Sequence, residues 1–591
     1  MSERSTVARH VRRELPRTPR ALWVAGGVAV MLATGVLYAV SRGKWSDAII
    51  DSGTDWVYAD ALARGEMLYR DVLYWFGPFT PYFQAAFFRL FGSSFSTLAL
   101  CGLAGASGVL LALYFALRRV TGRREAILWT ALAIPALVFM PNSGGAILGM
   151  GYRIWHPAGF ALAGCGLASL PGPCRNTLRC LGAGVCAGLA GLCRTEWGVI
   201  TLVSVLAAQW MRSRSAARPS RDILLTAAAA FVTFGAVLGG FAAAAGPAAL
   251  LRDAPVLLVG IPRGTPAGSV LAALRGWRDG IPVLLYSAAL WIGVVSLAGV
   301  LAARGVSNER ARHWLRVVLA VLAVIVLLAA AGAAQNAIFF SAAPLLCLAA
   351  LAAGLVRRRG PRAAALVAFG LLGLLASHRR LFHIADSGYV APPLLFAFVC
   401  AAGLLRTLVV LEKQHALRIR FCAILDGALA LLIGLAFLGR ALQYSSDERV
   451  PVPGTGGMLS ALPGTARDLA LVATMVRAET TEKDGLVVLP EGGVLNYLAE
   501  RPNPMRHKIS IPGYLRESNE EDFLRDLQRA RPAAIVIVKR PAGEYGRGLF
   551  GQGYGQRTRV WIERHYLRRS VPAAAAEVFT IAPGKSRDLP P

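Results

Sequence analysis

Long apolar runs, separated by short polar loops, recur along the chain between residues 21 and 442. A run of about 20 apolar residues is long enough to cross the hydrocarbon core of a bilayer as an α-helix. The pattern therefore predicts a polytopic α-helical membrane protein with about thirteen transmembrane helices. Some runs are shorter than about 17 residues, and one pair of them is compatible with a re-entrant hairpin. The runs cover residues 21–40, 95–117, 126–140, 157–170, 180–193, 197–211, 223–245, 281–303, 315–331, 337–356, 363–377, 390–411 and 421–442.

The loops between these runs alternate in charge. One set is basic or short and shares its side of the membrane with the basic N-terminal residues 1–20; it comprises loops 118–124, 175–179, 212–221, 304–314, 357–362 and 412–420. The positive-inside rule places this set in the cytoplasm. The other set faces outward and comprises loops 41–94, 141–156, 194–196, 246–280, 335–336 and 378–388 and the C-terminal tail. We therefore expect a protein of the cytoplasmic (inner) membrane with its N-terminus inside and its C-terminus outside.

The tail, residues 443–591, contains no further spanning run and alternates between strand-like and helix-like segments. Residues 485–489, 533–538 and 577–581 are strand-like, and residues 466–479 and 557–566 are helix-like. Ser518 and Glu521 have the spacing of a capping box for a further helix that ends near Arg531. This alternation predicts a small periplasmic α/β domain. The chain thus divides into residues 1–20, a transmembrane module at 21–442 and this domain at 443–591.

Composition agrees with the membrane class, because 55% of the residues are hydrophobic and only 16% are charged. The net charge of +29 would suit nucleic acid if it were clustered. The tail, however, has a net charge of only +4, so the remaining +25 lies mostly in the short loops of the membrane module. Such a distribution is a topology signal, and it argues against a nucleic-acid partner.

The nine cysteines lie in or beside apolar runs, and the sequence has no CxxC pair and no Cys/His spacing suited to zinc. We therefore interpret the cysteines as small packing residues. No metal ligand is predicted from them.

The first outward loop holds the strongest candidate for chemistry. Asp51 and Asp55 are four residues apart, so on a helix they share one face with Tyr58. Arg70 and Asp71 follow in the same loop. For its aromatic residues Trp56, Trp75, Phe76 and Phe83 we expect a structural role in an interfacial amphipathic helix. Asp51 is different, because a carboxylate held beside a bilayer is a functional candidate.

Three other outward loops carry polar residues that could complete a site. The first contains Tyr152, Arg153 and His156, and the second contains Arg194 and Glu196. The third contains His378, Arg379, Arg380 and His383. A buried structural ion pair is an equally good interpretation of Arg194 and Glu196. Because the positive-inside rule makes an outward basic cluster unusual, the third loop favours binding of a phosphate or pyrophosphate headgroup.

These residues together suggest transfer of a sugar from a lipid phosphate. A carboxylate in the first loop would deprotonate an acceptor hydroxyl, which would displace the phosphate at the anomeric carbon. Arginine and histidine side chains would offset the charge that grows on the leaving phosphate.

The first outward loop also resembles that of the GT-C superfamily of glycosyltransferases, which includes protein O-mannosyltransferases, lipid A aminoarabinose transferases and bacterial family 39-like enzymes. Matching positions in this loop are Asp51, Gly53, Ala59, Leu62, Gly65, Tyr69-Arg70-Asp71, Gly77-Pro78 and Leu90-Phe91-Gly92. RTEWG from Arg194 resembles a charged turn of these enzymes, and His383 with Pro392 resembles their late His-to-Pro loop. The tail resembles the outward domain of family 39-like proteins, in VVLPEGGVLNYLAERPNP from Val487 and FGQGYGQ from Phe550.

The resemblance implies a GT-C-like fold, a polyprenyl-phosphate-linked sugar donor, inversion at the anomeric carbon and an acidic base that corresponds to Asp51. Many relatives have an Asp-Glu pair where this chain has Asp51-Ser52, so Asp55 is the candidate for a second acid. Some relatives bind a divalent metal near this loop, and the missing pair argues against such a site here. Partners would be the lipid-linked donor, membrane lipid and a glycan, lipid or protein acceptor.

Three alternatives remain open. A lipid-linked oligosaccharide ligase or polymerase would share the spans and the outward arginines but would use a pyrophosphate-linked donor. A transporter or flippase of envelope glycolipids would have many spans, although the sequence shows no clear internal repeat. A non-catalytic assembly or sensor protein would depend on the tail instead.

Overall fold

The structure is a computed structural model of the whole chain. It describes residues 20–141, 145–148, 152–170, 177–213, 219–253, 337–357, 360–377, 391–411, 415–512, 514–515, 519–543, 547–573 and 575–581. Within these ranges the helices of residues 20–445 outside the first loop are α2 (Arg20–Ser41), α5 (Phe95–Val120), α6 (Arg123–Ala133), the π-helix η1 (Ile134–Val138), α7 (Tyr152–Ala168), α8 (Thr177–Cys193), α9 (Thr195–Ser213), α10 (Pro219–Ala245), α11 (Pro247–Asp253), α15 (Ala337–Arg357), α16 (Pro361–Ala376), α18 (Ala391–Leu411) and α19 (His415–Ser445).

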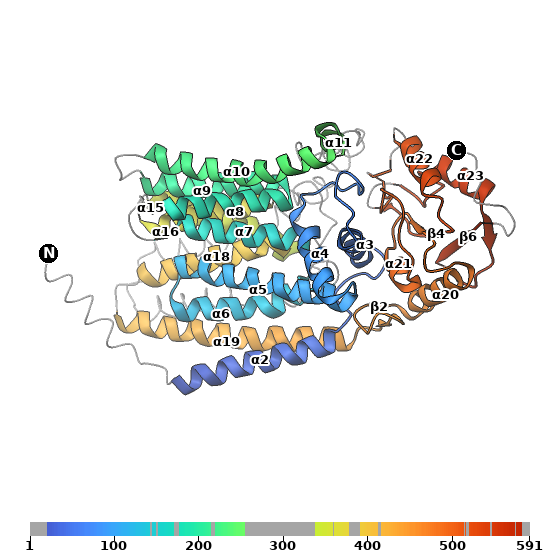
Figure 1. Cartoon of the computed structure of the whole chain (residues 1–591). Helices are drawn as coiled ribbons and strands as arrows, with labels where there is room; N and C mark the ends of the chain where they lie inside the picture. Colours follow the sequence, from blue (N-terminus) through green and yellow to red (C-terminus); the bar gives the residue numbers. More distant parts are fainter. Residues whose placement is uncertain are drawn as a thin grey trace.

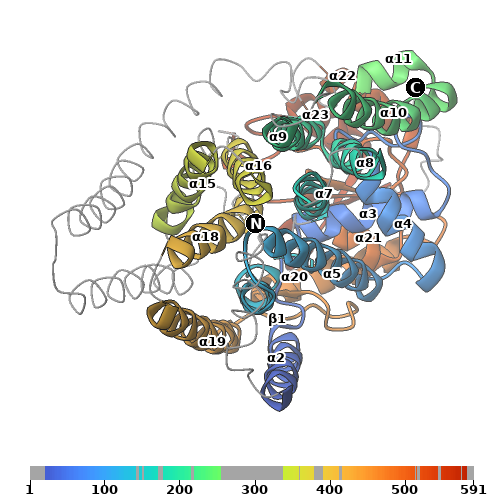
Figure 2. The same ribbon diagram turned by 90° about the vertical axis from the view of Figure 1, so that its left-hand side faces the viewer.

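These helices form a bundle that makes up one half of the molecule (Figure 1). Viewed along the bundle, they are seen nearly end-on, and α2 and α19 pack together at one edge (Figure 2). Each predicted apolar run within the described residues lies on one of these helices with at most two residues beyond its ends, except the run 126–140, which is divided between α6 and η1. The runs at 281–303 and 315–331 lie outside the described residues.

The bundle has the properties of a membrane-embedded structure. Four of the described helices are long and apolar enough to cross a membrane, namely Val24–Ser41, Phe95–Val120, Arg221–Ala245 and Cys422–Ser445. Their outer surfaces carry large exposed apolar side chains, such as Met31 on α2, Phe231 on α10 and Leu431 on α19. A soluble protein rarely exposes so much apolar surface, whereas lipid tails cover it at no cost.

Small residues let helices of the bundle approach closely. Gly184 of α8 faces the backbone of α10, where any added Cβ would overlap the carbonyl oxygen of Thr226. One turn later, a Cβ on Gly188 would lie 2.8 Å from the carbonyl oxygen of Ala230. Close backbone contact at small residues is the usual way in which membrane helices associate, because the hydrophobic effect does not drive their packing in lipid.

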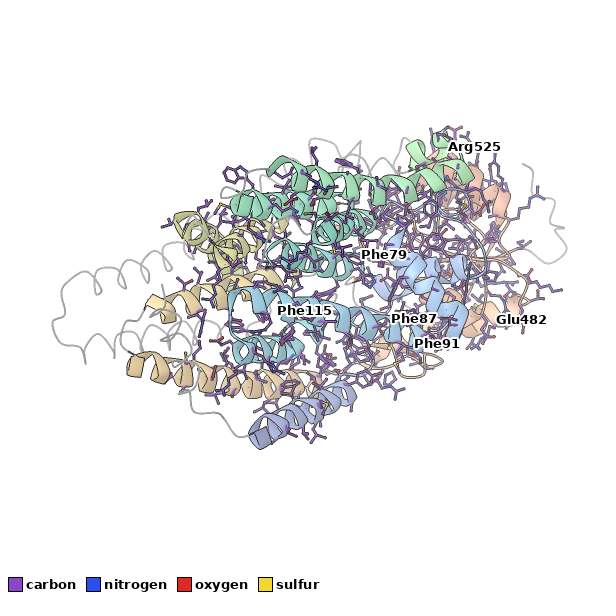
Figure 3. All side chains as sticks on the ribbon, turned by 60° about the vertical axis from the view of Figure 1, so that its left-hand side comes forward. Phe79, Phe87, Phe91, Phe115, Glu482 and Arg525 are labelled. Atoms are coloured by element: carbon purple, nitrogen blue, oxygen red, sulfur yellow. The ribbon has the colours of Figure 1, made fainter. Side chains whose placement is uncertain are left out.

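Two helices of the first loop, α3 (Asp51–Ala63) and α4 (Phe79–Phe91), lie between the bundle and the C-terminal domain (Figure 1). Figure 3 labels Phe79, Phe87 and Phe91 along α4, and Glu482 and Arg525 in the C-terminal domain. At the end of α4, Leu90 and Phe91 are exposed, as an interfacial helix requires. The interfacial expectation is wrong for Trp56 and Trp75, because their rings pack on Tyr497 and Tyr514 of the C-terminal domain.

The C-terminal domain contains a four-stranded mixed sheet with the order β3-β4-β6-β5. Its strands are β3 (Leu486–Leu489), β4 (Ala534–Val538), β5 (Leu567–Arg569) and β6 (Ala576–Thr580), and a separate pair joins β1 (Val450–Pro451) to β2 (Ser460–Ala461). The helices are α20 (Pro463–Glu479), α21 (Val494–Ala499), α22 (Glu520–Ala530) and α23 (Gln556–His565). Strand β3 is parallel to β4, and the other pairings of the sheet are antiparallel.

Both faces of the sheet are covered, which explains why its central strands are apolar throughout. Val488 and Val536 belong to the cluster that includes residues of α20 and extends into the bundle. Val487 and Ile535, which point the opposite way, pack in a second cluster with α22 and α23. The result is a three-layer α/β/α domain joined to the bundle through one continuous core.

Asp526 of α22 anchors a segment of the C-terminal domain that touches the first loop. Its carboxylate accepts hydrogen bonds from the backbone nitrogen of His507 at 3.0 Å and pairs with the His507 ring at 2.7 Å. Burial acts to raise the pKa of Asp526, but the bonds from His507 outweigh it and hold the pKa below the ordinary value of 3.8. The ionised form is therefore the one that the fold stabilises.

We expect Asp526→Asn to lower the free energy of unfolding by about 1.5–3 kcal/mol at neutral pH, since hydrogen bonds to a charged group are lost. A depressed carboxylate pKa stabilises the fold above the unfolded pKa, and this contribution disappears only as the pH falls through the folded pKa. Thermal unfolding should therefore show a smaller difference from wild type below about pH 4 than at about pH 5. Asp522→Asn, an exposed position on the same helix, is the control and should change stability by less than about 0.5 kcal/mol. A difference that closes between pH 7 and pH 5 would be inconsistent with this assignment.

Candidate functional site

The candidate site begins where α3 begins. A tight turn precedes the helix, in which the Asp47 carboxylate accepts hydrogen bonds from the backbone nitrogens of Ile49 and Ile50, each at 2.8 Å. Asp51 is the first residue of α3 and lies in the positive field of the helix N-terminus. The side chains of Asp51 and Asp55 are 7% and 4% exposed, so two carboxylates are buried one helical turn apart.

Contacts on two sides hold this end of α3. On the bundle side, the Ser52 hydroxyl donates to the carbonyl of Leu148 at 3.3 Å and also bonds the Ser46 hydroxyl. On the other side, Gly53 packs directly against the start of α21, where an added Cβ would lie 2.5 Å from the backbone nitrogen of Val494. The buried acids therefore lie where the bundle, the first loop and the C-terminal domain meet.

A third buried carboxylate on α3 has a structural role. Asp60 pairs with Arg64 and accepts a hydrogen bond from the Ser93 hydroxyl at 2.8 Å, which ties α3 to the residue before the α5 cap. Burial raises the pKa of Asp60, and the charge of Arg64 and the bond from Ser93 oppose that shift. Its partners, Arg64 directly after α3 and Ser93 before α5, meet it near the C-terminal end of α3.

Of the three other residues predicted in the first loop, Tyr58 lies on α3 itself, whereas Arg70 and Asp71 lie beyond it. Tyr58 is buried, and its ring packs edge-on against Tyr74 at 4.9 Å. Arg70 and Asp71 form an exposed ion pair at 2.7 Å, and the hydrogen bond from Arg70 lowers the pKa of Asp71. The pair is solvated and does not share the buried environment of Asp51.

The RTEWG turn lies against the first loop. Arg194 is 3% exposed, and its Nε lies 2.8 Å from the Glu196 carboxylate. The Arg194 guanidinium also covers the ring of Phe76 at 4.8 Å, and the backbone nitrogen of Gly77 donates to the carbonyl of Cys193 at 3.1 Å. The ion pair, which was one of two equally good interpretations of the sequence, is present, and it adjoins the loop that carries the acids.

His156 lies among α4, α5 and α7. Its Nδ1 is 3.2 Å from the Thr80 hydroxyl, and its ring packs edge-on against Phe79 and Phe83 of α4. Gly105 of α5 leaves the room that the ring needs, since a Cβ there would lie 2.9 Å from Nε2. Tyr152 and Arg153 open α7, but their side chains lie outside the described residues, as do His378, Arg379, Arg380 and His383.

The C-terminal domain contributes residues that the sequence interpretation missed. Glu491, which is 4% exposed, follows β3, and Arg540 follows the parallel strand β4; Arg540 Nε lies 2.8 Å from the Glu491 carboxylate. Gly492, which follows Glu491, lies beside Ile49, and Ile49 is two positions before Asp51. The available signal was that ligands gather at the carboxyl ends of parallel strands, but the sequence alone did not show that β3 and β4 are neighbours.

The residues at 51 and 52 do not fit a metal-binding pair of acids. Ser52 stands at the second position, and its hydroxyl is bonded to Ser46 and Leu148. Within the described part of the chain, no group of three or more His, Cys, Asp or Glu side chains is placed to hold a metal ion.

The fold is similar to those of solved membrane glycosyltransferases. The oligosaccharyltransferase of Archaeoglobus fulgidus, solved with a tethered acceptor peptide containing the NVT sequon, matches with a TM-score of 0.50 at 15% identity, over 96% of this chain and 74% of that chain. ArnT from Cupriavidus metallidurans bound to undecaprenyl phosphate matches with a TM-score of 0.49 at 13% identity, over 96% and 99% of the two chains. The oligosaccharyltransferase AglB from A. fulgidus, in complex with an inhibitory peptide and a dolichol-phosphate, gives a TM-score of 0.48 at 14% identity, over 96% and 75%.

No protein-family model and no curated protein matches this sequence. At such low identity the structural similarity establishes the fold alone. The similarity to the oligosaccharyltransferase fold agrees with the GT-C-like fold that the resemblance in the first loop implies.

Proposed function

We propose that this chain is a membrane glycosyltransferase that moves a sugar from a polyprenyl-phosphate-linked donor to an acceptor hydroxyl, with inversion and with Asp51 as the general base. The observation that carries the proposal is the burial of Asp51 and Asp55 at the start of α3, between the bundle and the C-terminal domain. Burial keeps bulk water from these carboxylates, so they can act on a hydroxyl with little competition from water.

The proposed reaction uses the two acids of α3 and Arg194. The Asp51 carboxylate takes the proton of the acceptor hydroxyl, and the hydroxyl oxygen forms a bond to the anomeric carbon from the face opposite the phosphate. The bond between the anomeric carbon and the phosphate oxygen breaks, and the electron pair leaves with the lipid phosphate. Arg194 offsets the charge on this leaving group. Asp55, one turn along α3, keeps the acceptor and Asp51 oriented.

The donor enters from the bilayer, and the transfer takes place on the outer face of the cytoplasmic membrane. In this arrangement residues 1–20 are cytoplasmic, residues 21–442 form the catalytic membrane module, and residues 443–591 form an extracytoplasmic domain. The charge pattern of the loops supports this orientation. In this proposal the basic segment with His378, Arg379, Arg380 and His383 binds the lipid phosphate together with Arg194 and the start of α7 at Tyr152 and Arg153.

A second candidate is transfer of a complete lipid-linked oligosaccharide. The similarity to an oligosaccharyltransferase favours it, because that enzyme transfers an oligosaccharide and shares the fold. A donor assay separates the two candidates. Purified protein in proteoliposomes is given a monophosphate-linked monosaccharide or a pyrophosphate-linked oligosaccharide, and transfer to an acceptor mixture of glycans, lipids and peptides is followed by mass spectrometry.

Arg194→Gln tests the donor side of the proposal. Loss of a buried charge beside the leaving phosphate should raise the KM for the donor by about 10- to 100-fold, because a charge-assisted hydrogen bond contributes about 1.5–3 kcal/mol. Arg118→Gln, in the opposite end of the bundle, should leave the donor KM unchanged. If wild type, Arg194→Gln and Arg118→Gln had equal donor KM values, Arg194 would not bind the donor.

A further inference from the structure

Tyr69 of the first loop has a backbone conformation that aromatic residues rarely adopt. Its φ is +69°, in the left-handed region, and its side chain is completely buried. A bulky residue keeps such a conformation only where its surroundings hold it, and such positions occur often at functional sites. The strained backbone of Tyr69 therefore points to a role beyond packing.

Hydrogen bonds on both sides hold Tyr69 in place. Within the loop, its backbone nitrogen donates to the carbonyl of Val72 at 2.8 Å, and its hydroxyl donates to the carbonyl of Phe76 at 2.8 Å. From the C-terminal domain, Arg506 donates through Nη2 to the carbonyl of Tyr69 at 3.0 Å and through Nε to the carbonyl of Arg70 at 3.2 Å. The backbone nitrogen of Leu73 returns a bond to the carbonyl of Arg506 at 2.9 Å.

Further contacts between the same two segments make this a stable junction. The buried Lys508 pairs with Glu66 at 2.8 Å, and the rings of Trp75 and Tyr514 stack with centroids 3.7 Å apart. The junction therefore spans the loop from residue 66 to residue 75. Its position relative to the C-terminal domain is determined by an ion pair, backbone hydrogen bonds and a stacked aromatic pair.

On the other side, Phe76 connects Tyr69 to Arg194. The carbonyl of Phe76 accepts the Tyr69 hydrogen bond, and its ring lies 4.8 Å from the Arg194 guanidinium. The next residue, Gly77, is held against the end of α8 by its bond to Cys193. Continuous contacts thus run from Arg506 through Tyr69 and Phe76 to Arg194.

We propose that Tyr69 is a positioning residue that couples the C-terminal domain to the anion-binding side chain of Arg194. The inference rests on the proposed function in one respect, namely that Arg194 binds the lipid phosphate of the donor. Tyr69 touches neither the donor nor the acceptor. It sets the place of Phe76, whose ring supports the guanidinium, so its hydroxyl acts on donor binding and has little effect on the chemical step.

Tyr69→Phe, compared with Tyr566→Phe, tests this role. Tyr566 is also buried, and its hydroxyl donates to the carbonyl of Pro532 at 2.9 Å, so each variant loses one bond of the same kind. Both variants should lose similar thermal stability. Only Tyr69→Phe should raise the donor KM and weaken binding of undecaprenyl phosphate, each by about 3- to 10-fold, with kcat within about twofold of wild type. Arg506→Met, which removes the contact from the C-terminal domain, should weaken the same binding in the same direction.

Binding of undecaprenyl phosphate to the purified full-length protein in detergent is measured by native mass spectrometry. This measurement distinguishes failure of the proposed function from failure of the proposed role of Tyr69. Wild-type protein that neither binds this lipid nor transfers sugar contradicts the proposed function. Wild-type protein that does both, with Tyr69→Phe indistinguishable from Tyr566→Phe in lipid affinity and donor KM, overturns the role of Tyr69 and leaves the proposed function intact.

Discussion

Asp51→Asn is expected to lower sugar transfer by about 10²- to 10⁴-fold, which is the usual contribution of a positioned general base. Asparagine has nearly the same shape as aspartate, but it cannot accept the acceptor's proton. The variant should therefore insert into the membrane and bind the donor as wild type does. The measurement is the initial transfer rate in proteoliposomes at saturating donor, together with the yield of folded protein.

Asp60→Asn is the matched control, because it removes a buried carboxylate from the same helix. Asp60 is bonded to Arg64 and Ser93, so its replacement should reduce stability and leave kcat within a few-fold of wild type. Asp55→Asn should fall between the two if Asp55 orients Asp51. Near-normal transfer by Asp51→Asn would show that this residue is not the base.

Gly493→Ala should have the second-largest effect, by moving the helix that carries the base. A Cβ at residue 493 would overlap the carbonyl oxygen of Gly53 and lie 3.1 Å from the Cβ of Val57. Since the overlap is with backbone, it can be relieved only by separating α3 from the start of α21. We expect a loss of about 1–3 kcal/mol of stability and a fall in kcat of about 100-fold, because small misplacements of a catalytic group are costly.

Gly464→Ala is the control for this prediction. Gly464 lies in the first turn of α20 with no atom within 4 Å of an added Cβ, and alanine suits a helix better than glycine. Its activity should be unchanged and its stability equal or slightly higher. Retention of wild-type kcat by Gly493→Ala would mean that contact with the C-terminal domain does not position α3.

Much of the helical architecture could be predicted, because membrane helices are specified by local composition. The run at 95–117 became α5 at Phe95–Val120, and the run at 180–193 became α8 at Thr177–Cys193. The strands at 485–489 and 533–538 were also found within one residue of β3 and β4. A continuous apolar segment bounded by polar residues is recognisable without knowledge of its neighbours.

The exact residue at which a helix begins was harder to predict than the helix itself. The helix that ends near Arg531 is present as α22, but it begins at Glu520 with Asn519 at its N-cap, and Ser518 of the expected capping box lies outside the described residues. The Glu520 carboxylate accepts a hydrogen bond from the backbone nitrogen of Thr558 at 2.9 Å. The preference of a buried acid for a distant backbone donor cannot be read from local spacing.

The candidate site was predicted only in part for the same reason. A helix that starts at Asp51 follows from local sequence, and the buried pair of Arg194 and Glu196 is close along the chain. The contacts of Gly53 with Gly493 and of Tyr69 with Arg506 join residues more than 400 positions apart. Nothing in the periodicity of either segment indicates such a partner.

Acceptor-dependent release of polyprenyl phosphate is the most direct test of the proposed sugar transfer. Wild-type protein in proteoliposomes is given undecaprenyl phosphate carrying a labelled sugar, with and without acceptor, and both lipid and label are followed by mass spectrometry. We expect free undecaprenyl phosphate and glycosylated acceptor to appear in equal amounts, with the anomeric configuration inverted, and only when acceptor is present. Movement of the intact labelled donor across the bilayer, without cleavage of the sugar–phosphate bond, would contradict the proposed sugar transfer and identify a transporter.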